Sequence, residues 1–396
     1  MAARIIHVDL DAFFVEVCRQ RHPELRGVEL LVVGGRRDSR GVVQSASYGA
    51  RRYGIHAGMP IGQAVRLCPR ATFFQGAVPH YRDASRAVRA VLQGHAPTVV
   101  MASLDEAYLD FAGTERLHPV SLLPAAERLR DDVRRETGLD CSVGIGPNRM
   151  IAKLASDCAK PRGLMEVRAG WEEGFLAGLP LQALPGIGPK TAARLAELGL
   201  RDVHQIQRMT EGALERLLGP EARALKRRAH GHGGTTLNAA RLPRSMSRET
   251  TLSRDLRDAE ELEAILALLT ARVAGQLREE GLVARTVTLK LRHDDFHTVT
   301  RRRTLETATD LDPEIFGAAR ALFREAFEDV RRRDRGVRLI GIAATNLGAA
   351  AEADLFEPEA RRRQRELSSA VDKVREKYGF AAVTPGAALR ARRRDD

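Results

Sequence analysis

The sequence predicts an α+β protein with several domains, and three observations lead to this prediction. Its 396 residues correspond to about two to four domains of ordinary size. Up to about residue 170, segments with the two-residue period of strands alternate with segments that have the helical period. A region of short helices broken by glycine and proline follows, and the alternation returns from residue 245. Two β/α domains separated by a helical region are therefore expected.

The chain opens with a predicted strand and helix. Residues 4–9 alternate and are rich in β-branched side chains, which is typical of a strand. Asp11 stands where a carboxylate can cap a helix, and we expect that helix from Ala12 to about Arg21. Residues 28–75 are rich in glycine and predict a mixture of short strands and short helices.

The following elements complete a known order of strands and helices. We expect a helix at 81–92, strands at 98–101 and 107–111 around a turn at 104–106, a helix at 124–137, a strand at 140–145 and a helix at 148–158. Together with the first strand and helix this is the βαββαβ order of a ferredoxin-like sheet. The glycine-rich residues 28–75 are then an insertion after the first helix.

The second half repeats the alternation after a helical region. Short helices are expected from 171 to about 234, followed by a polar, basic linker that ends at 244. Beyond it we expect helices at 258–280 and 313–332, strands at 283–292, 297–304 and 337–345, and a further helix near 358–378. This order predicts a second, smaller β/α domain.

The composition narrows the class of protein. Hydrophobic residues make up 43% of the chain and charged residues 29%, as in folded globular proteins. No segment approaches 18 consecutive apolar residues, so no membrane span is expected. The net charge of +12 favours a polyanionic partner, whereas the aromatic content of 5% argues against a base-stacking platform. The four cysteines lack the spacing of zinc ligands, and with no export signal we expect reduced thiols in a cytoplasmic protein.

Three carboxylates are expected to meet at one end of the first sheet. Asp9 ends the first strand, and Asp105 and Glu106 stand in the turn between the two central strands. Such a cluster suits Mg²⁺, which takes a few carboxylates together with substrate phosphates. Two such ions can activate a hydroxyl and stabilise a leaving pyrophosphate. Taken alone, the spacing equally allows carboxylates that merely lie at strand ends on the surface.

A further group of residues has the chemistry of phosphate contacts. Ser45, Tyr48 and Arg51 recur at a spacing that places them on roughly one helix face, and Lys160 could add a point charge. Ordinary surface polarity is the alternative interpretation.

The region LPGIGPKTAARLAELGL predicts a helix-hairpin-helix. Gly186 and Gly188 would expose backbone N–H groups to a DNA phosphate, and Lys190 follows in the next helix. A basic segment at 285–303, which includes Arg301 and Arg303, is the other candidate DNA-binding element. A plain helical turn and a solvated, salt-bridged surface are the respective alternatives.

Six motifs occur in an order that resembles a known family. They are HVDLDAFFVEV, SASYGARRYGIHAGMP, SLDEAYLD, CSVGIGPNRMIAKLASDCAKPRGL, LPGIGPKTAARL and SMSRETTLSRDL. Together they resemble Y-family translesion DNA polymerases of the bacterial DNA polymerase IV type, from about residue 4 to 347. The resemblance implies a right-hand polymerase with a ferredoxin-like palm (1–12 and 80–170), small fingers (13–79), a helix-hairpin-helix thumb (171–235), a linker (236–244), a β/α little finger (245–347) and a tail (348–396).

The resemblance also implies roles for individual residues. Asp9, Asp105 and Glu106 match the catalytic carboxylates that bind two Mg²⁺ ions, for which Mn²⁺ could substitute, and the Leu10 carbonyl matches a further metal ligand. Ser45, Tyr48, Arg51 and Lys160 match contacts to the incoming triphosphate. Phe14 matches the aromatic residue that discriminates between sugars, because a rigid ring beneath the sugar would clash with a 2′-hydroxyl.

The implied activity is template-directed, low-fidelity DNA synthesis from dNTPs on primer–template DNA, by a monomer without a proofreading exonuclease. Residues 352–356 resemble a peptide that binds the sliding clamp: its anchors Leu355 and Phe356 are present, but Glu352 replaces the usual glutamine. Two other functions stay open, a non-catalytic DNA-binding scaffold and another palm-type nucleotidyl enzyme such as a cyclase. The three carboxylates argue against the scaffold, whereas the helix-hairpin-helix and Phe14 argue against the cyclase.

Overall fold

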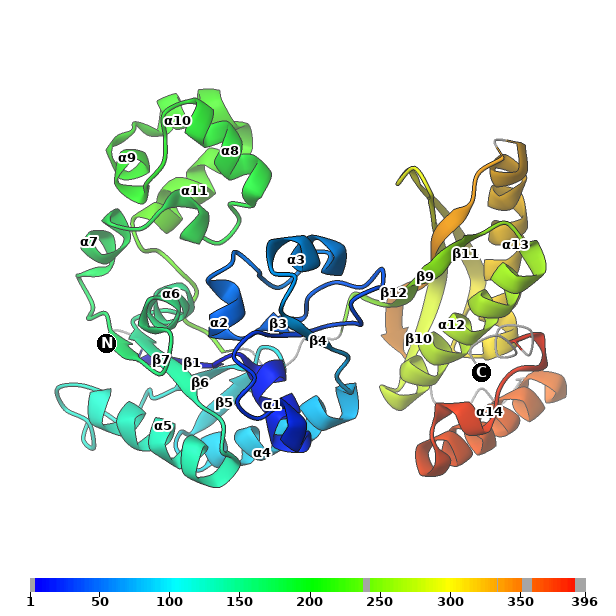
Figure 1. Ribbon diagram of the computed structural model, residues 1–396, viewed down its shortest axis with the longest axis horizontal. Helices are drawn as coiled ribbons and strands as arrows, with labels where there is room; N and C mark the ends of the chain where they lie inside the picture. Colours follow the sequence, from blue (N-terminus) through cyan, green and yellow to red (C-terminus); the bar gives the residue numbers. More distant parts are fainter. Residues whose placement is uncertain (1–3, 238–242, 333, 351–357, 389–396) are drawn as a thin grey trace. The chain divides into compact units, whose positions relative to one another are not determined.

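A computed structural model describes residues 4–237, 243–332, 334–350 and 358–388. The chain divides into two compact units, residues 1–240 and residues 241–396 (Figure 1). The two units are described separately. None of the helices in the described ranges is long and apolar enough to span a bilayer. All four cysteines are free thiols, and only Cys158 is exposed.

The first unit is built on a five-stranded sheet with the order β5-β6-β1-β7-β8. The strands are β1 (Ile5–Leu10), β5 (Thr98–Met101), β6 (Glu106–Asp110), β7 (Cys141–Gly146) and β8 (Leu164–Glu166). β1 pairs antiparallel with both β6 and β7, which is the pairing of a ferredoxin-like sheet, so this prediction is confirmed. β8 is an additional short strand, parallel to β7, that the sequence patterns did not indicate.

Helices cover both faces of this sheet. They are α1 (Phe13–Arg21), α4 (Val78–Gln93), α5 (Leu123–Thr137) and α6 (Arg149–Ala159). Ile6, Val8 and Leu10 share a core with α1, α4 and α5. Ile5 packs with Ala152 of α6 on the other face, so His7 and Asp9 also point toward the α6 side. β1 is therefore buried along its whole length, polar residues included.

The expected cap of the first helix is wrong. α1 begins at Phe13, and its N-cap is Ala12, which has a left-handed φ of 47° and no side-chain capping bond. The Asp11 carboxylate instead accepts hydrogen bonds from the Tyr48 hydroxyl, the Ser142 hydroxyl and the Arg162 backbone. These partners come from distant parts of the chain, so no local pattern could reveal them.

The glycine-rich insertion forms a small layer of its own. Its sheet has the order β3-β2-β4, with β2 (Leu31–Val33), β3 (Ser45–Ala46) and β4 (Thr72–Phe74). The 3₁₀ turn η1 (Pro23–Leu25) precedes it, and the helices α2 (Tyr48–Arg51) and α3 (Ile61–Leu67) pack on a compact apolar core.

Short helices follow β8, as expected. They are α7 (Glu172–Ala177), η2 (Leu181–Ala183), α8 (Pro189–Glu197), α9 (Val203–Arg208), α10 (Glu211–Leu218), η3 (Gly219–Glu221) and α11 (Ala222–Ala229). Their core includes Met150, Ile151 and Leu154, so this helical region packs against one end of α6.

The second unit contains a four-stranded antiparallel sheet with the order β11-β10-β12-β9. Its strands are β9 (Ser245–Leu256), β10 (Leu282–His293), β11 (Thr298–Thr309) and β12 (Val337–Ala349), and the helices α12 (Ala259–Glu279) and α13 (Asp312–Arg332) supply the rest of its core. The sequence analysis missed β9, because it is an edge strand with only Met246, Leu252 and Leu256 buried.

The chain continues on this unit beyond the sheet. The helix α14 (Glu359–Tyr378) has the predicted position, and the 3₁₀ turns η4 (Phe380–Ala382) and η5 (Gly386–Ala388) follow it. Arg278 of α12 binds Asp372 of α14 at 2.5 Å and Asp312 at 2.8 Å. Part of the predicted tail is therefore folded against the second unit. The boundaries of the smaller domains stay a prediction.

Candidate active site

The sequence-predicted catalytic and nucleotide residues line a single cavity of about 160 Å³ in the first unit. This cavity lies where the end of β1 meets the turn before β6, α2 and the segment after α6. All nine predicted residues border it: Asp9, Leu10, Phe14, Ser45, Tyr48, Arg51, Asp105, Glu106 and Lys160. Residues separated by more than a hundred positions are thus brought together.

Asp9 and Glu106 lie side by side on neighbouring strands. They are direct partners in the β1–β6 register, so both side chains point to the α6 face of the sheet. Each carboxylate is bound by a lysine: Lys160 Nζ donates to Asp9 Oδ2 at 2.6 Å, and Lys153 Nζ donates to Glu106 Oε1 at 2.6 Å. Two ammonium groups therefore offset the charge of two carboxylates in a largely buried place.

The two carboxylates differ in acidity. Burial raises the pKa of Asp9, and the Lys160 ammonium offsets this only in part. The His7 imidazole and the Lys153 ammonium lower the pKa of Glu106 to about 2. The His7 Nε2 atom is 3.7 Å from Glu106 Oε2, too far for a hydrogen bond, so Lys153 makes the direct contact. Glu106 is the more readily ionised carboxylate of the pair.

Asp105 lines the same cavity but points into its own turn. Its Oδ1 atom accepts a hydrogen bond from the Ser103 hydroxyl at 2.5 Å, and its carbonyl accepts one from the Leu10 N–H at 2.9 Å. Within the described ranges, no three His, Cys, Asp or Glu side chains are grouped closely enough to hold a metal ion. The donor set fits Mg²⁺ by its chemistry, since it offers carboxylate oxygens and a backbone carbonyl, but Asp105 would have to turn away from Ser103.

Three of the predicted nucleotide contacts come from β3 and α2. Tyr48 and Arg51 come from α2, with the Arg51 guanidinium 4.8 Å from the centre of the Tyr48 ring. Arg51 Nε donates to the Ala46 carbonyl at 2.9 Å. Burial and the hydrogen bond to Asp11 raise the pKa of the Tyr48 phenol. Ser45 precedes them in β3 and is buried.

Phe14 also lines the cavity. It is partly buried and packs on the fully buried Tyr81, with ring centres 4.3 Å apart, and on Phe13, with ring centres 5.3 Å apart. Two aromatic neighbours therefore hold the ring in one place at the border of the cavity.

Sequence reasoning missed three polar residues that contact the predicted site. They are His7, Asp11 and Lys153. His7 is completely buried, and its Nδ1 atom is 2.7 Å from the Ser156 hydroxyl. Lys153 could have been found, because it is a basic residue of the same sequence motif as Lys160 and precedes it by seven residues. His7 and Asp11 carry no comparable local signal.

The turn of the predicted helix-hairpin-helix lies between the 3₁₀ turn η2 and the helix α8. Gly186 has a φ of +91°, Gly188 is the N-cap of α8, and Lys190 is exposed in its first turn. A Cβ atom at position 186 would meet the Arg228 guanidinium at 2.9 Å, so an arginine of α11 lies directly against the turn. The hairpin is separate from the cavity.

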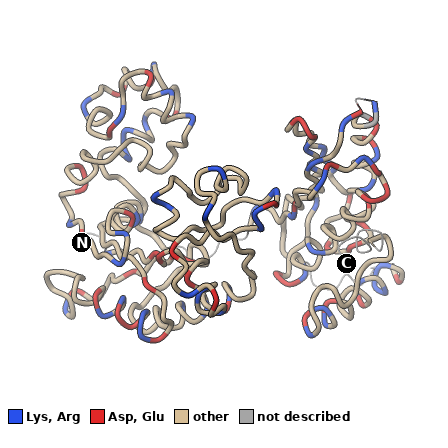
Figure 2. Tube along the Cα trace, in the orientation of Figure 1, with Lys and Arg blue, Asp and Glu red and all other residues tan. Residues whose placement is uncertain are grey.

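The basic residues of β11 are divided between the two faces of its sheet. Arg301 and Arg303 are register partners of Leu289 and Val287, which are buried beneath the helices. Arg302 points to the opposite, open face, as does Lys290. Figure 2 shows Lys and Arg in blue along the β10–β11 hairpin and Asp and Glu in red at its tip.

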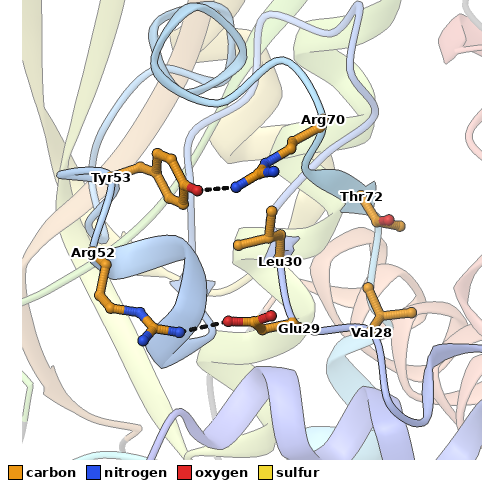
Figure 3. Close-up of a pocket in the computed structure, with 7 residues that line it drawn as sticks. All are labelled: Val28, Glu29, Leu30, Arg52, Tyr53, Arg70 and Thr72. Atoms are coloured by element: carbon orange, nitrogen blue, oxygen red, sulfur yellow. Dashed lines mark hydrogen bonds and ion pairs between the residues drawn. The ribbon is translucent and has the colours of Figure 1, made fainter.

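A second hollow in the first unit has a different character (Figure 3). Its lining includes Arg52, which binds Glu29 at 2.5 Å, and Arg70, which donates to the Tyr53 hydroxyl. Both guanidinium groups are thus engaged by neighbours in the hollow, and none of the predicted site residues borders it.

Carboxylates at the end of a strand in a ferredoxin-like sheet, which share one cavity with a tyrosine and an arginine of α2, are typical of palm-type nucleotidyl-transfer enzymes. Comparison with known proteins identifies the family. The model described as the impB/mucB/samB family matches residues 8–157, and the model of that family's C-terminal domain matches residues 243–367. The chain belongs to this family, the Y-family DNA polymerases, in the group of DNA polymerase IV.

Individual relatives match over nearly the whole chain. DNA polymerase IV of Caulobacter vibrioides is 40% identical over 98% of this chain and 94% of the relative. DNA polymerase IV of Dehalococcoides mccartyi is 38% identical over 98% of both chains. Among solved structures, a Y-family DNA polymerase chimera of Dbh and Dpo4 has a TM-score of 0.75 at 28% identity, over 87% of this chain and 98% of that one. The insertion ternary complex of Dbh DNA polymerase has a TM-score of 0.57 at 27% identity, with the same coverage of both chains.

Proposed function

We propose that this polymerase carries out template-directed, low-fidelity DNA synthesis across damaged templates, by transfer of a nucleotidyl group from a dNTP to a primer 3′-hydroxyl. The observation that carries the proposal is the single cavity shared by the three carboxylates, the phosphate-contact residues and Phe14. The ternary complex of Dbh DNA polymerase among the structural relatives supports primer–template DNA and a nucleotide as the ligands.

Each wall of the cavity has a part in this reaction. Asp9, Asp105, Glu106 and the Leu10 carbonyl would hold two Mg²⁺ ions, with Mn²⁺ as a possible substitute. When bound, these ions supply activation of the 3′-hydroxyl and neutralisation of the pyrophosphate charge. Ser45, Tyr48, Arg51 and Lys160 orient the triphosphate. Lys160 binds Asp9 at 2.6 Å, so it lies at the boundary between the carboxylates and the phosphate contacts.

Phe14 accounts for the choice of sugar. Its ring is fixed against Tyr81 and Phe13, and it therefore cannot move aside easily for an additional hydroxyl. A deoxyribose fits above such a ring, and a ribose does not.

Low fidelity follows from the small fingers. The insertion that faces the cavity has its own small core and only short elements. A pocket that checks the shape of a nascent pair loosely discriminates by only a few kcal/mol. We therefore propose synthesis without proofreading, together with tolerance of a damaged template base.

Primer extension with the four dNTPs and Mg²⁺ tests this proposal, on an undamaged template and on one with an abasic site. The expected result is short extension products on the first template and some bypass on the second. Omission of the template provides the control, because a cyclase-like enzyme would consume nucleotide without it. Absence of extension, with primer–template binding intact, would refute the proposal.

We also propose a contact with the replication sliding clamp through residues 352–356. Leu355 and Phe356 lie outside the described residues, so the proposal rests on their sequence alone. Replacement Phe356→Ala should abolish co-elution with the clamp while extension of a short primer without clamp stays unchanged. Equal clamp binding by the variant would contradict the assignment.

A further inference from the structure

Asp11 is a buried carboxylate that borders the nucleotide-binding residues and has no role in the function proposed above. It follows β1 directly and is 5% exposed. Its oxygens accept four hydrogen bonds from three donors. Tyr48 Oη binds Oδ1 at 2.6 Å, Arg162 N binds Oδ2 at 2.8 Å, and Ser142 Oγ is 3.1 Å from both oxygens.

The three donors belong to different parts of the first unit. Tyr48 begins α2 in the glycine-rich insertion. Ser142 lies in the sheet strand β7, and it is completely buried. Arg162 lies two residues after Lys160, in the segment that leads from α6 to β8. One carboxylate therefore joins α2 and the Lys160 segment to a rigid sheet strand.

All three donors are neutral groups, namely a phenol, an aliphatic hydroxyl and a backbone N–H. Hydrogen bonds to an ionised carboxylate are short and directional, and a buried carboxylate needs them to offset its lost hydration. The contacts of Asp11 thus fix the positions of their donors. They contrast with those of Asp9 and Glu106, whose partners are lysine ammonium groups.

We propose that Asp11 is a positioning residue, which holds Tyr48 and the segment carrying Lys160 at the separation that an incoming triphosphate requires. This role rests on the proposed function of the cavity. Tyr48 has one hydroxyl proton and donates it to Asp11, so Asp11 fixes where the Tyr48 side chain and α2, which also carries Arg51, lie at the cavity. Asp11 acts on the affinity for the nucleotide, and the primer 3′-hydroxyl and the DNA do not depend on it.

The variant Asp11→Asn tests the role with little change of volume. An amide keeps one acceptor oxygen and presents an NH₂ group in place of the other, so it must face either the Arg162 N–H or the Tyr48 hydroxyl with a donor. We expect the KM for dNTP to rise about tenfold, with kcat changed less than about threefold. Asp131→Asn, an exposed substitution on α5, is the matched control and should leave both constants unchanged.

Equilibrium binding gives a readout that does not depend on turnover. The affinity for dNTP is measured on the complex with a dideoxy-terminated primer–template, for wild type, Asp11→Asn, Tyr48→Phe and the double variant. If Asp11 acts through Tyr48, the losses of dNTP affinity in the two single variants are not additive. The double variant then binds dNTP about as weakly as the single variant with the lower affinity. Affinity for the primer–template itself should be the same in all four proteins.

Unchanged dNTP affinity in Asp11→Asn, or additive losses in the four-protein cycle, would overturn the proposal. If Asp11→Asn does not fold, as judged by circular dichroism, Ser142→Ala decides, since it removes only the sheet donor to the carboxylate. A KM for dNTP raised about threefold in Ser142→Ala supports the role, and an unchanged KM refutes it. If the wild-type chain does not extend a primer at all, the proposed function itself is refuted. If the wild type extends the primer and these variants keep normal dNTP affinity, only the proposed role of Asp11 is refuted.

Discussion

The sheets of the two units have the same order of elements, βαββαβ, but their charged residues lie in opposite kinds of place. In the first unit β1 is central, between β6 and β7, and its end carries buried carboxylates. In the second unit the basic residues Arg301, Arg302 and Arg303 lie within β11, which is an edge strand. The position of a strand in its sheet therefore decides which chemistry its residues can support.

The difference has a physical basis in burial. At the end of a central strand, two neighbouring strands and α6 exclude water, so a few charges interact strongly and the pKa values of Asp9 and Glu106 move apart. On an edge strand the charges are hydrated and screened, and each adds a small amount to the attraction of a polyanion. The first arrangement suits a reaction at one point, and the second suits binding along a backbone.

The largest effect is expected from the carboxylates. Asp105→Ala should lower the rate of primer extension by at least about 100-fold, because it removes one of the three carboxylates proposed to hold the metal ions. Asp110→Asn, at the other end of the same strand, is the control and should extend normally. Binding of primer–template, measured by fluorescence anisotropy, should stay unchanged in both. Full polymerisation by Asp105→Ala would show that Asp105 has no part in the chemistry. The contrast drawn here between the two units would then lose its basis.

A change of sugar preference is expected from Phe14. Phe14→Ala removes the ring proposed to lie beneath the nucleotide sugar and should raise the efficiency of ribonucleotide incorporation at least about tenfold relative to dNTP. Single-nucleotide insertion with a dNTP and the matching rNTP measures the ratio, and residual dNTP insertion reports that the variant is folded. Continued exclusion of rNTPs would show that another side chain makes this choice.

The smallest effect is expected on the sheet of the second unit. Arg302→Ala should weaken primer–template binding a few-fold and reduce the slope of log Kd against log salt by about one. Arg320→Ala, on α13 and paired with Glu263, is the matched control and should leave the slope unchanged. If Arg301 and Arg303 rather than Arg302 change the slope, the helix-covered side of β11 is the DNA-binding side.

The sequence predicted those parts of the site that local patterns or motifs carry. The order of the strands around β1 could be predicted from short segments with a clear period. The grouping of the carboxylates with Tyr48 and Arg51 could be predicted from short motifs with clear chemistry. The edge strand β9 escaped because its alternation is mostly polar, and the contacts of Asp11 escaped because its partners are 37, 131 and 151 residues away. His7 was missed for the same reason. Its partner Ser156 is 149 residues away, so in the sequence His7 looks like any polar residue of a strand.

The most direct test measures kcat at saturating primer–template and Kd for primer–template in the same preparations of Glu106→Gln and Arg302→Ala. If the first unit carries out the reaction and the basic residues of β11 bind DNA, Glu106→Gln loses nearly all kcat and keeps the wild-type Kd. Arg302→Ala then keeps the wild-type kcat and has a raised Kd. A loss of kcat in Arg302→Ala comparable to that in Glu106→Gln would contradict it, because chemistry would then depend on the second unit as much as on the first.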